Sequence, residues 1–166
     1  MFDLTGKVAL LTGASKGMGL AMATGLAQHG ATVVISARKL DQLETAAAGI
    51  NALGLGKAIP IACNIGYEDQ LQALVDQTHA VAGPIDIVVG NAGVNPYYGP
   101  TSEIPNDAYQ KTMNANVLSN LWLARMVAPD MVAKGAGSMM FTSSVGAFKP
   151  SVKLGTYGMS KLALIG

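Results

Sequence analysis

A short apolar run that leads straight into a glycine-rich turn restricts the fold of this chain more than any other feature. Residues 8–11 are all apolar, and Gly13, Gly17 and Gly19 follow them almost at once. An apolar run of this length suits either a strand or a buried helix, but the glycines favour a strand, a tight turn and then a helix. That helix is expected to run to about His29, just before a glycine that can cap it. The segment predicts the first strand and helix of an α/β domain.

The rest of the chain alternates in the same way. Apolar or β-branched runs are separated by Ala- and Leu-rich segments of helical length. We expect further strands at 32–36, 58–62, 85–89 and 138–142, and helices at 39–53, 68–82, 106–134 and from about 156. Pro129 lacks a backbone donor, so it is expected to kink the long helix or to mark a local end. Repeated strand–helix units predict a Rossmann-type, doubly wound parallel sheet.

Composition and charge exclude several other classes of protein. The chain has 166 residues, half of them hydrophobic and 13% charged, which suits one domain with buried parallel strands. A net charge of +1 without a basic run gives no indication of nucleic-acid or anionic-membrane binding. No apolar run approaches eighteen residues, residues 1–4 show no pattern that predicts a secretory signal, and a single cysteine, Cys63, fits a reducing compartment. We expect a cytoplasmic protein. His29 and His79 have no second ligand at metal spacing, so no metal site is predicted.

The glycine-rich turn has the context that a phosphate-binding turn requires, because it follows a strand and opens a helix. Glycines allow the backbone to approach a pyrophosphate, whose charge the helix N-terminus favours. The spacing is Gly-x-x-x-Gly-x-Gly, and the alternative is a turn without a ligand. The predicted dinucleotide contacts in this turn are Gly13, Ser15, Lys16, Gly17, Met18 and Gly19.

The end of the second strand indicates which dinucleotide is bound. Sites for NAD place an acidic residue there, on the ribose 2′-hydroxyl. This strand ends in Ser36-Ala37-Arg38, without a carboxylate that would repel a 2′-phosphate. Arg38 can bind such a phosphate bidentately, and Lys16 can add a second positive charge. The alternative is that both are solvated loop cations. Together they favour NADP(H).

Tyr157 and Lys161 stand four residues apart near the end of the sequence. On a helix they share one face, where an ammonium can depress the pKa of a phenol and make it a usable proton donor. This spacing also arises by chance, so it gains meaning only from the dinucleotide site.

From about Gly6 onward, these residues resemble the classical short-chain dehydrogenase/reductase family. The turn at 12–19 is similar to its cofactor motif, Tyr157-x-x-x-Lys161 to its active-site motif, and residues 90–93 to its Asn-Asn-Ala-Gly motif, with Gly90 in place of the first Asn. The resemblance implies further cofactor contacts, at the ribose by Asn91, Ala92 and Gly93, at adenine by Asn64 and Ile65, and at the nicotinamide end by Tyr157 and Lys161. Asn64 stands where the family usually has Asp, and its amide can still bond an adenine edge.

The resemblance also implies a catalytic set of Asn116, Ser144, Tyr157 and Lys161. The family's Ser lies thirteen residues before the Tyr, which gives Ser144, with Ser143 as a structural neighbour. Asn116 is followed by Val117, as in the family, whereas the nearby Asn114 is not followed by a branched apolar residue. In the implied reaction a carbonyl receives hydride from the nicotinamide and a proton from Tyr157. Ser144 polarises the carbonyl, Lys161 also holds the ribose, and Asn116 anchors a relay water.

The expected activity is that of an NADP-dependent carbonyl reductase or alcohol dehydrogenase acting on a small or medium apolar substrate. One alternative is a 3-oxoacyl-thioester reductase that recognises an acyl-carrier protein, for which Lys149 and Lys153 form a thin basic patch. A second is a non-catalytic NADP-binding or structural protein. Residues 1–166 are expected to form a single NADP(H)-binding Rossmann domain that lacks its usual C-terminal part. The helices from Asn106 and Thr156 resemble the family's oligomer faces, so a homodimer or homotetramer is expected.

Overall fold

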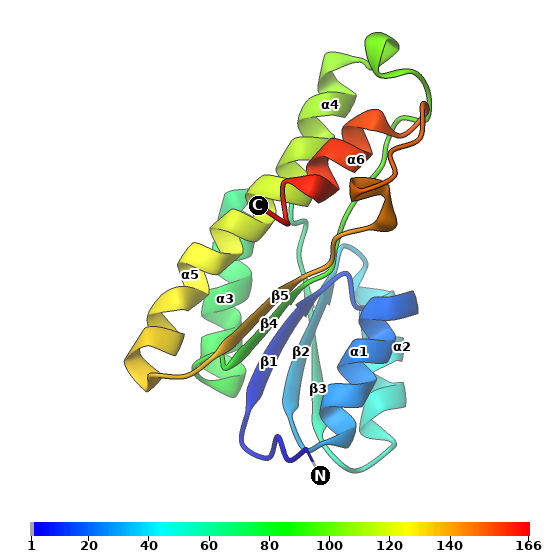
Figure 1. The fold of residues 1–166 in the computed structure, drawn as a ribbon. Helices are drawn as coiled ribbons and strands as arrows, with labels where there is room; N and C mark the ends of the chain where they lie inside the picture. The colour runs from blue at the N-terminus through cyan, green and yellow to red at the C-terminus, as the bar shows by residue number, and fades with distance from the viewer. Residues whose placement is uncertain (1) are drawn as a thin grey trace.

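A computed structural model describes residues 2–166 and confirms the predicted class, a parallel sheet covered by helices (Figure 1). Strands and helices alternate along the chain, except that two helices in succession lie between the fourth and fifth strands. The elements are β1 (Val8–Thr12), α1 (Gly17–Gln28), β2 (Thr32–Ala37), α2 (Leu40–Asn51), β3 (Lys57–Ala62), α3 (Glu68–Ala82), β4 (Ile87–Gly90), α4 (Asn106–Met113), α5 (Ser119–Lys134), β5 (Ser138–Phe141) and α6 (Gly155–Leu162). Short 3-10 turns lie at Thr101–Glu103 and Val145–Ala147.

The strand order is β3-β2-β1-β4-β5, and each neighbouring pair is parallel. The chain builds outward from β1 to β2 and β3, and then returns to place β4 on the other side of β1. At such a reversal, the loops that leave β1 and β4 diverge and open a crevice at the carboxyl ends of the strands. The topology therefore puts the glycine-rich turn after β1 beside residues 91–93 after β4.

Helices cover both faces of the sheet and enclose two apolar cores (Figure 1). On one face α1 and α2 pack against β1 and β2, with Leu11, Val33 and Ile35 completely buried. On the other face α3 and α5 pack over Leu10 and Val34. Since successive strand residues point to opposite faces, the continuous apolar runs in the sequence reflect burial on both sides.

The long helix predicted for residues 106–134 differs from the expectation in where it is interrupted. It continues through Pro129 to Lys134 and does not end at the proline. Its irregularity lies earlier, at Asn114–Leu118, where one π-helical turn separates α4 from α5. Such turns are uncommon and are frequent at functional sites. This one contains the predicted catalytic residue Asn116.

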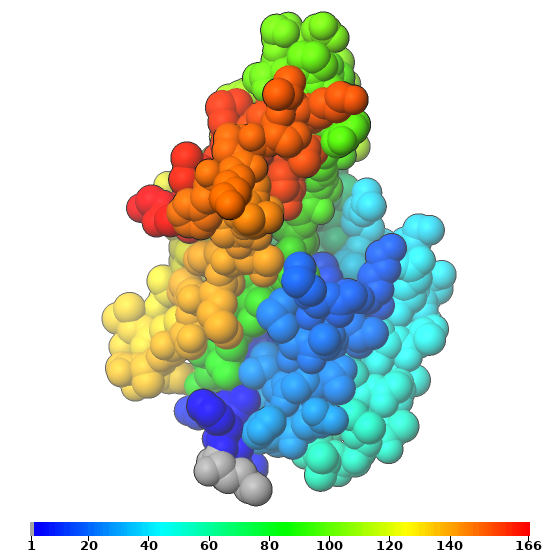
Figure 2. All heavy atoms as spheres, turned by 45° about the vertical axis from the view of Figure 1, so that its right-hand side comes forward, coloured from blue at the N-terminus to red at the C-terminus, as the bar shows by residue number. Residues whose placement is uncertain are grey.

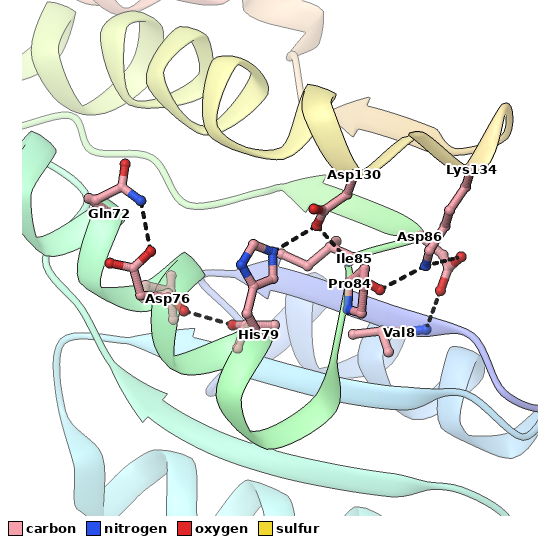
Figure 3. Close-up of polar contacts among 11 residues, drawn as sticks. Val8, Gln72, Asp76, His79, Pro84, Ile85, Asp86, Asp130 and Lys134 are labelled. Carbon is pink, nitrogen blue, oxygen red and sulfur yellow. Dashed lines mark hydrogen bonds and ion pairs between the residues drawn. The ribbon is translucent and has the colours of Figure 1, made fainter. Parts of the chain in front are cut away.

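Polar contacts connect the amino-terminal ends of the central strands, at the end of the sheet opposite the crevice (Figure 3). The Asp86 carboxylate accepts from Val8 N at 2.9 Å and from Lys134 Nζ at 2.8 Å. Burial raises the pKa of Asp86, but these hydrogen bonds and the charges of Lys134 and Lys7 outweigh it and leave the pKa lowered. This network ties β1, β4 and the end of α5 together.

In residues 2–166 no helix has the length and apolarity needed to cross a membrane.

Candidate active site

A cleft of about 570 Å³ lies at the carboxyl ends of the strands. Figure 2 shows the later segments, orange to red, in the upper part of the molecule next to green segments, with the blue and cyan half below them. The cleft brings together twelve of the predicted cofactor contacts: Gly13, Ser15, Lys16, Gly17, Met18, Gly19, Arg38, Asn64, Ile65, Asn91, Ala92 and Gly93. Residues from four separate loops therefore line one surface, as a dinucleotide requires.

Close backbone packing holds the glycine-rich turn against the loop after β4. Gly13 has φ +66°, and a Cβ there would lie 2.8 Å from the Cα of Ala92. The side-chain amide of Asn91 donates to Gly13 O at 3.0 Å and to Thr12 O at 3.3 Å. Its Oδ1 accepts from the Thr142 hydroxyl at 3.3 Å. Asn91 therefore connects the ends of β1, β4 and β5, and its side chain supports the turn.

Three cations line the cleft: Lys16 from the turn, Arg38 from the end of β2 and Lys111 from α4. All three are exposed, and none forms an ion pair with another of the described residues. No Asp or Glu within residues 2–166 lines this cleft. Unpaired positive charge beside a glycine-rich helix N-terminus suits a ligand that carries several phosphates. Lys111 was not predicted, because it belongs to no motif and lies far along the sequence from the turn.

The loop after β3 also lines the cleft. Asn64 Oδ1 accepts from Gly66 N at 3.2 Å, which fixes the side chain with its amide unbonded. Tyr67 also lines the cleft and is half exposed. Burial, and next the charge of Asp69, raises the pKa of the Cys63 thiol to about 11. Cys63 is 4% exposed, so it is a small buried apolar side chain and not a nucleophile.

Lys161 is buried beside Tyr157 on α6. Only 3% of it is exposed, and its Nζ lies 6.0 Å from the centre of the Tyr157 ring. The ammonium donates to Thr142 O at 2.7 Å, and burial lowers the pKa of Lys161. A Cβ on Gly93 would lie 3.2 Å from Lys161 Nζ, so the ammonium is next to the end of the cleft. The predicted pair is thus adjacent to the predicted cofactor surface.

The two neighbouring serines have different partners. Ser143 Oγ donates to Lys161 O at 2.7 Å and so joins the loop to α6. Ser144 Oγ accepts from Gly146 N at 3.1 Å, which leaves its own proton free to donate. A Cβ on Gly146 would lie 3.4 Å from Ser144 Oγ and 3.7 Å from Tyr157 Cε1, so this hydroxyl and the phenol ring border the same space.

Asn116 connects the loop after β4 to the helix that carries Tyr157. Its side chain bonds both backbone groups of Val94, accepting from N at 2.7 Å and donating to O at 2.9 Å. It also donates to Ser160 Oγ at 2.9 Å, and that hydroxyl donates to Tyr157 O at 2.7 Å. The side chain is completely buried. Asn114, the alternative, lies in the same π-helical turn and makes none of these side-chain bonds.

Comparison with known proteins gives a consistent result. The sequence pattern of the family described as short chain dehydrogenase matches residues 7–166. A rabbit (Oryctolagus cuniculus) protein, "Dehydrogenase/reductase SDR family member 4", is 38% identical over 98% of this chain and 62% of its own length. The human protein of the same description is 37% identical over 58% of its length. This chain therefore spans about three fifths of the length of the curated relatives that it matches.

Solved structures agree in fold and in the kind of cofactor. A metagenomic short-chain oxidoreductase in complex with NADP superimposes with a TM-score of 0.93 at 34% identity, over 98% of this chain and 73% of that one. A 7α-hydroxysteroid dehydrogenase in complex with NADH and 7-oxo-glycochenodeoxycholic acid superimposes with a TM-score of 0.92 at 33% identity. The match covers 98% of this chain and 62% of that one. A nicotinamide dinucleotide is thus common to both, although the two differ in the 2′-phosphate.

Proposed function

This chain belongs to the short chain dehydrogenase family, and we propose that it interconverts a carbonyl and a secondary alcohol, with NADP(H) as hydride carrier. One observation carries the proposal: the buried Lys161 ammonium lies beside both the Tyr157 ring and Gly93, which lines the dinucleotide cleft. A proton donor and a hydride carrier would therefore meet at one place.

The residues divide the proton chemistry between them. When bound, the cofactor supplies a hydride to the carbonyl carbon. Tyr157 donates the phenolic proton to the developing alkoxide and recovers it from the alcohol in the reverse direction. Lys161, held on Thr142 O, stabilises the phenolate that remains. Ser144 donates to the carbonyl oxygen with the proton that its turn leaves free.

Asn116 has a supporting part in this proposal. Its side chain is occupied by Val94 and Ser160, so we assign it the alignment of the loop after β4 with α6. The relay water that the family resemblance implies stays a prediction.

The proposed preference for NADP(H) over NAD(H) rests on charge. Lys16, Arg38 and Lys111 face a cleft whose described lining has no carboxylate. NADP(H) carries a 2′-phosphate in addition to the pyrophosphate, and Arg38, directly after β2, suits that group. Assembly as a homodimer or homotetramer in the cytoplasm stays part of the proposal.

Two alternatives are separated by one experiment. A 3-oxoacyl-thioester reductase would use the exposed Lys149 and Lys153, although Lys153 Nζ already lies 5.5 Å from the centre of the Tyr98 ring. We would follow oxidation of NADPH and NADH with simple apolar ketones and with 3-oxoacyl thioesters. Turnover of the ketones with NADPH supports the main proposal, and turnover restricted to thioesters favours the alternative. Cofactor binding without turnover of any carbonyl would contradict both and indicate a non-catalytic protein.

A further inference from the structure

The space beside Gly90 is filled by side chains from two other elements. Gly90 ends β4. It stands where the family's Asn-Asn-Ala-Gly motif has its first asparagine. A Cβ built there would collide with Asn120 Oδ1 and lie 2.5 Å from Phe141 Cδ1. Asn120 comes from α5 and is only 5% exposed. A carboxamide is therefore present at this place, but it is provided by the helix and not by the strand.

The same carboxamide binds the π-helical turn. Asn120 Nδ2 donates to Asn116 O at 2.9 Å, and the neighbouring Ser119 Oγ donates to Ala115 O at 2.7 Å. Both carbonyls belong to the turn Asn114–Leu118. In an α-helix a carbonyl accepts from the N–H four residues on, and a π turn moves that partner to five residues on. The side chain of the residue four positions later can then donate to that carbonyl, as the buried side chains of Ser119 and Asn120 do here.

This turn carries the groups that align the candidate active site. The Asn116 side chain holds Val94 and Ser160, and Ser160 Oγ donates to the backbone of Tyr157. A continuous set of contacts thus runs from Gly90 through Asn120 and Asn116 to α6. Shortening Asn120 would free the Asn116 carbonyl and leave a space beside Gly90.

We propose that Asn120 is a positioning residue for the reaction proposed above: it fills the space beside Gly90 and fixes the π turn through the Asn116 carbonyl. The expected effect of Asn120 on turnover rests on the proposed function. The packing of Asn120 against Gly90 is independent of that function and can be measured without catalysis.

The first test compares Asn120→Ala with Asn120→Ser. Alanine removes the donor, whereas a serine can reach the carbonyl four residues back, as Ser119 does on the same helix. We expect Asn120→Ala to lower kcat about tenfold, because small displacements of reacting groups are costly. The Kd for NADPH should stay within about twofold, and Asn120→Ser should recover most of kcat. Equal loss in the two variants, or loss confined to the Kd, would overturn the positioning role.

Thr112→Val is the matched control. Thr112 is 1% exposed and donates to Ala108 O at 2.8 Å, so its loss removes a comparable buried bond elsewhere in the helix. This variant should lose stability like Asn120→Ala but keep kcat. A similar fall in kcat would show that any weakening of the helix suffices, and would contradict a specific role for Asn120.

The second test is a double-mutant cycle in thermal unfolding. Gly90→Ala should lower the Tm by about 5 °C in the wild-type background and by clearly less in Asn120→Ala, since the smaller residue removes one of the two clashes. Additive shifts would refute the pairing of Gly90 with Asn120. If no carbonyl is reduced at all, the proposed function fails together with the effect on turnover, while this cycle still decides the packing.

Discussion

The ammonium of Lys161 donates to the carbonyl of Thr142 at 2.7 Å, across the loop that joins β5 to α6. Thr142 directly follows β5, so the bond fixes Lys161 relative to the sheet and not only to its own helix. It holds the charge 6.0 Å from the centre of the Tyr157 ring, with 3% of the residue exposed. Burial without a described carboxylate partner lowers the pKa of Lys161, and this has a measurable consequence.

Turnover should fall on the alkaline side at a pH below the ordinary lysine value. Because burial favours the neutral amine, a rising pH removes the charge of Lys161 before that of an exposed lysine. The stabilisation of the Tyr157 phenolate is lost with it. The measurement is kcat/KM against pH, and Lys161→Met should lower it at least about a hundredfold. Lys57→Met, the same change at an exposed residue of β3, should leave the profile intact.

Arg38→Asp should reverse the cofactor preference. The variant places a carboxylate where the 2′-phosphate is expected, so NADPH should bind about 10- to 100-fold more weakly, with little change for NADH. Titration of each cofactor gives the two Kd values. Lys39→Asp is the control, because Lys39 is an exposed neighbour outside the lining of the cleft. Equal weakening of both cofactors by Arg38→Asp would refute the assignment.

Lys111→Met should weaken both cofactors by a similar factor of about three to ten. Lys111 lines the cleft from α4, on a different element from Arg38, so we expect it to act on the whole anionic ligand. The factor should shrink as ionic strength rises, because an exposed charge is screened by salt. A loss restricted to NADPH would place the 2′-phosphate near Lys111, contrary to this account.

Asp86 should make the stability of the fold depend on pH below about 4. Its pKa is lowered in the folded chain, so it binds a proton less readily there than in the unfolded chain. The stabilisation that ionised Asp86 gives the folded chain is fully present above the pKa of an unfolded aspartate. It is lost as the pH falls through the lower pKa of Asp86 in the folded chain. Asp86→Asn should cost about 2 kcal/mol at pH 7 and flatten this acid dependence. The test is urea unfolding of the wild type and of Asp86→Asn between pH 7 and 3. If the free energy of unfolding falls with pH as steeply in the variant as in the wild type, the role of Asp86 is contradicted.

The sheet was predictable because its signals are local. The apolar runs at β1 and β4 and the glycines at 13–19 restrict the backbone irrespective of distant residues, and the observed strands agree with the predicted ones to within about two residues. The family resemblance is likewise confirmed over residues 7–166.

The π-helical turn was not predictable from its own residues. Asn114–Leu118 has the composition of an ordinary helix, and the Asn116 side chain within it bonds Val94 and Ser160, which lie 22 and 44 residues away in the sequence. The proline at 129 was the visible irregularity, yet α5 continues through it. Likewise, nothing near Lys111 in the sequence indicates that the fold brings it to the same cleft as Arg38. Such features become visible only once the chain is folded.

The most direct test of the account is the turnover of Tyr157→Phe, which removes one hydroxyl and keeps the ring. With NADPH and a carbonyl that the wild type reduces, kcat should fall by about 10² to 10⁴ while the Kd for NADPH stays unchanged. Tyr109→Phe, on the exposed surface of α4, should behave as wild type. If Tyr157→Phe retains the wild-type kcat, Tyr157 is not the proton donor and the proposed mechanism is wrong.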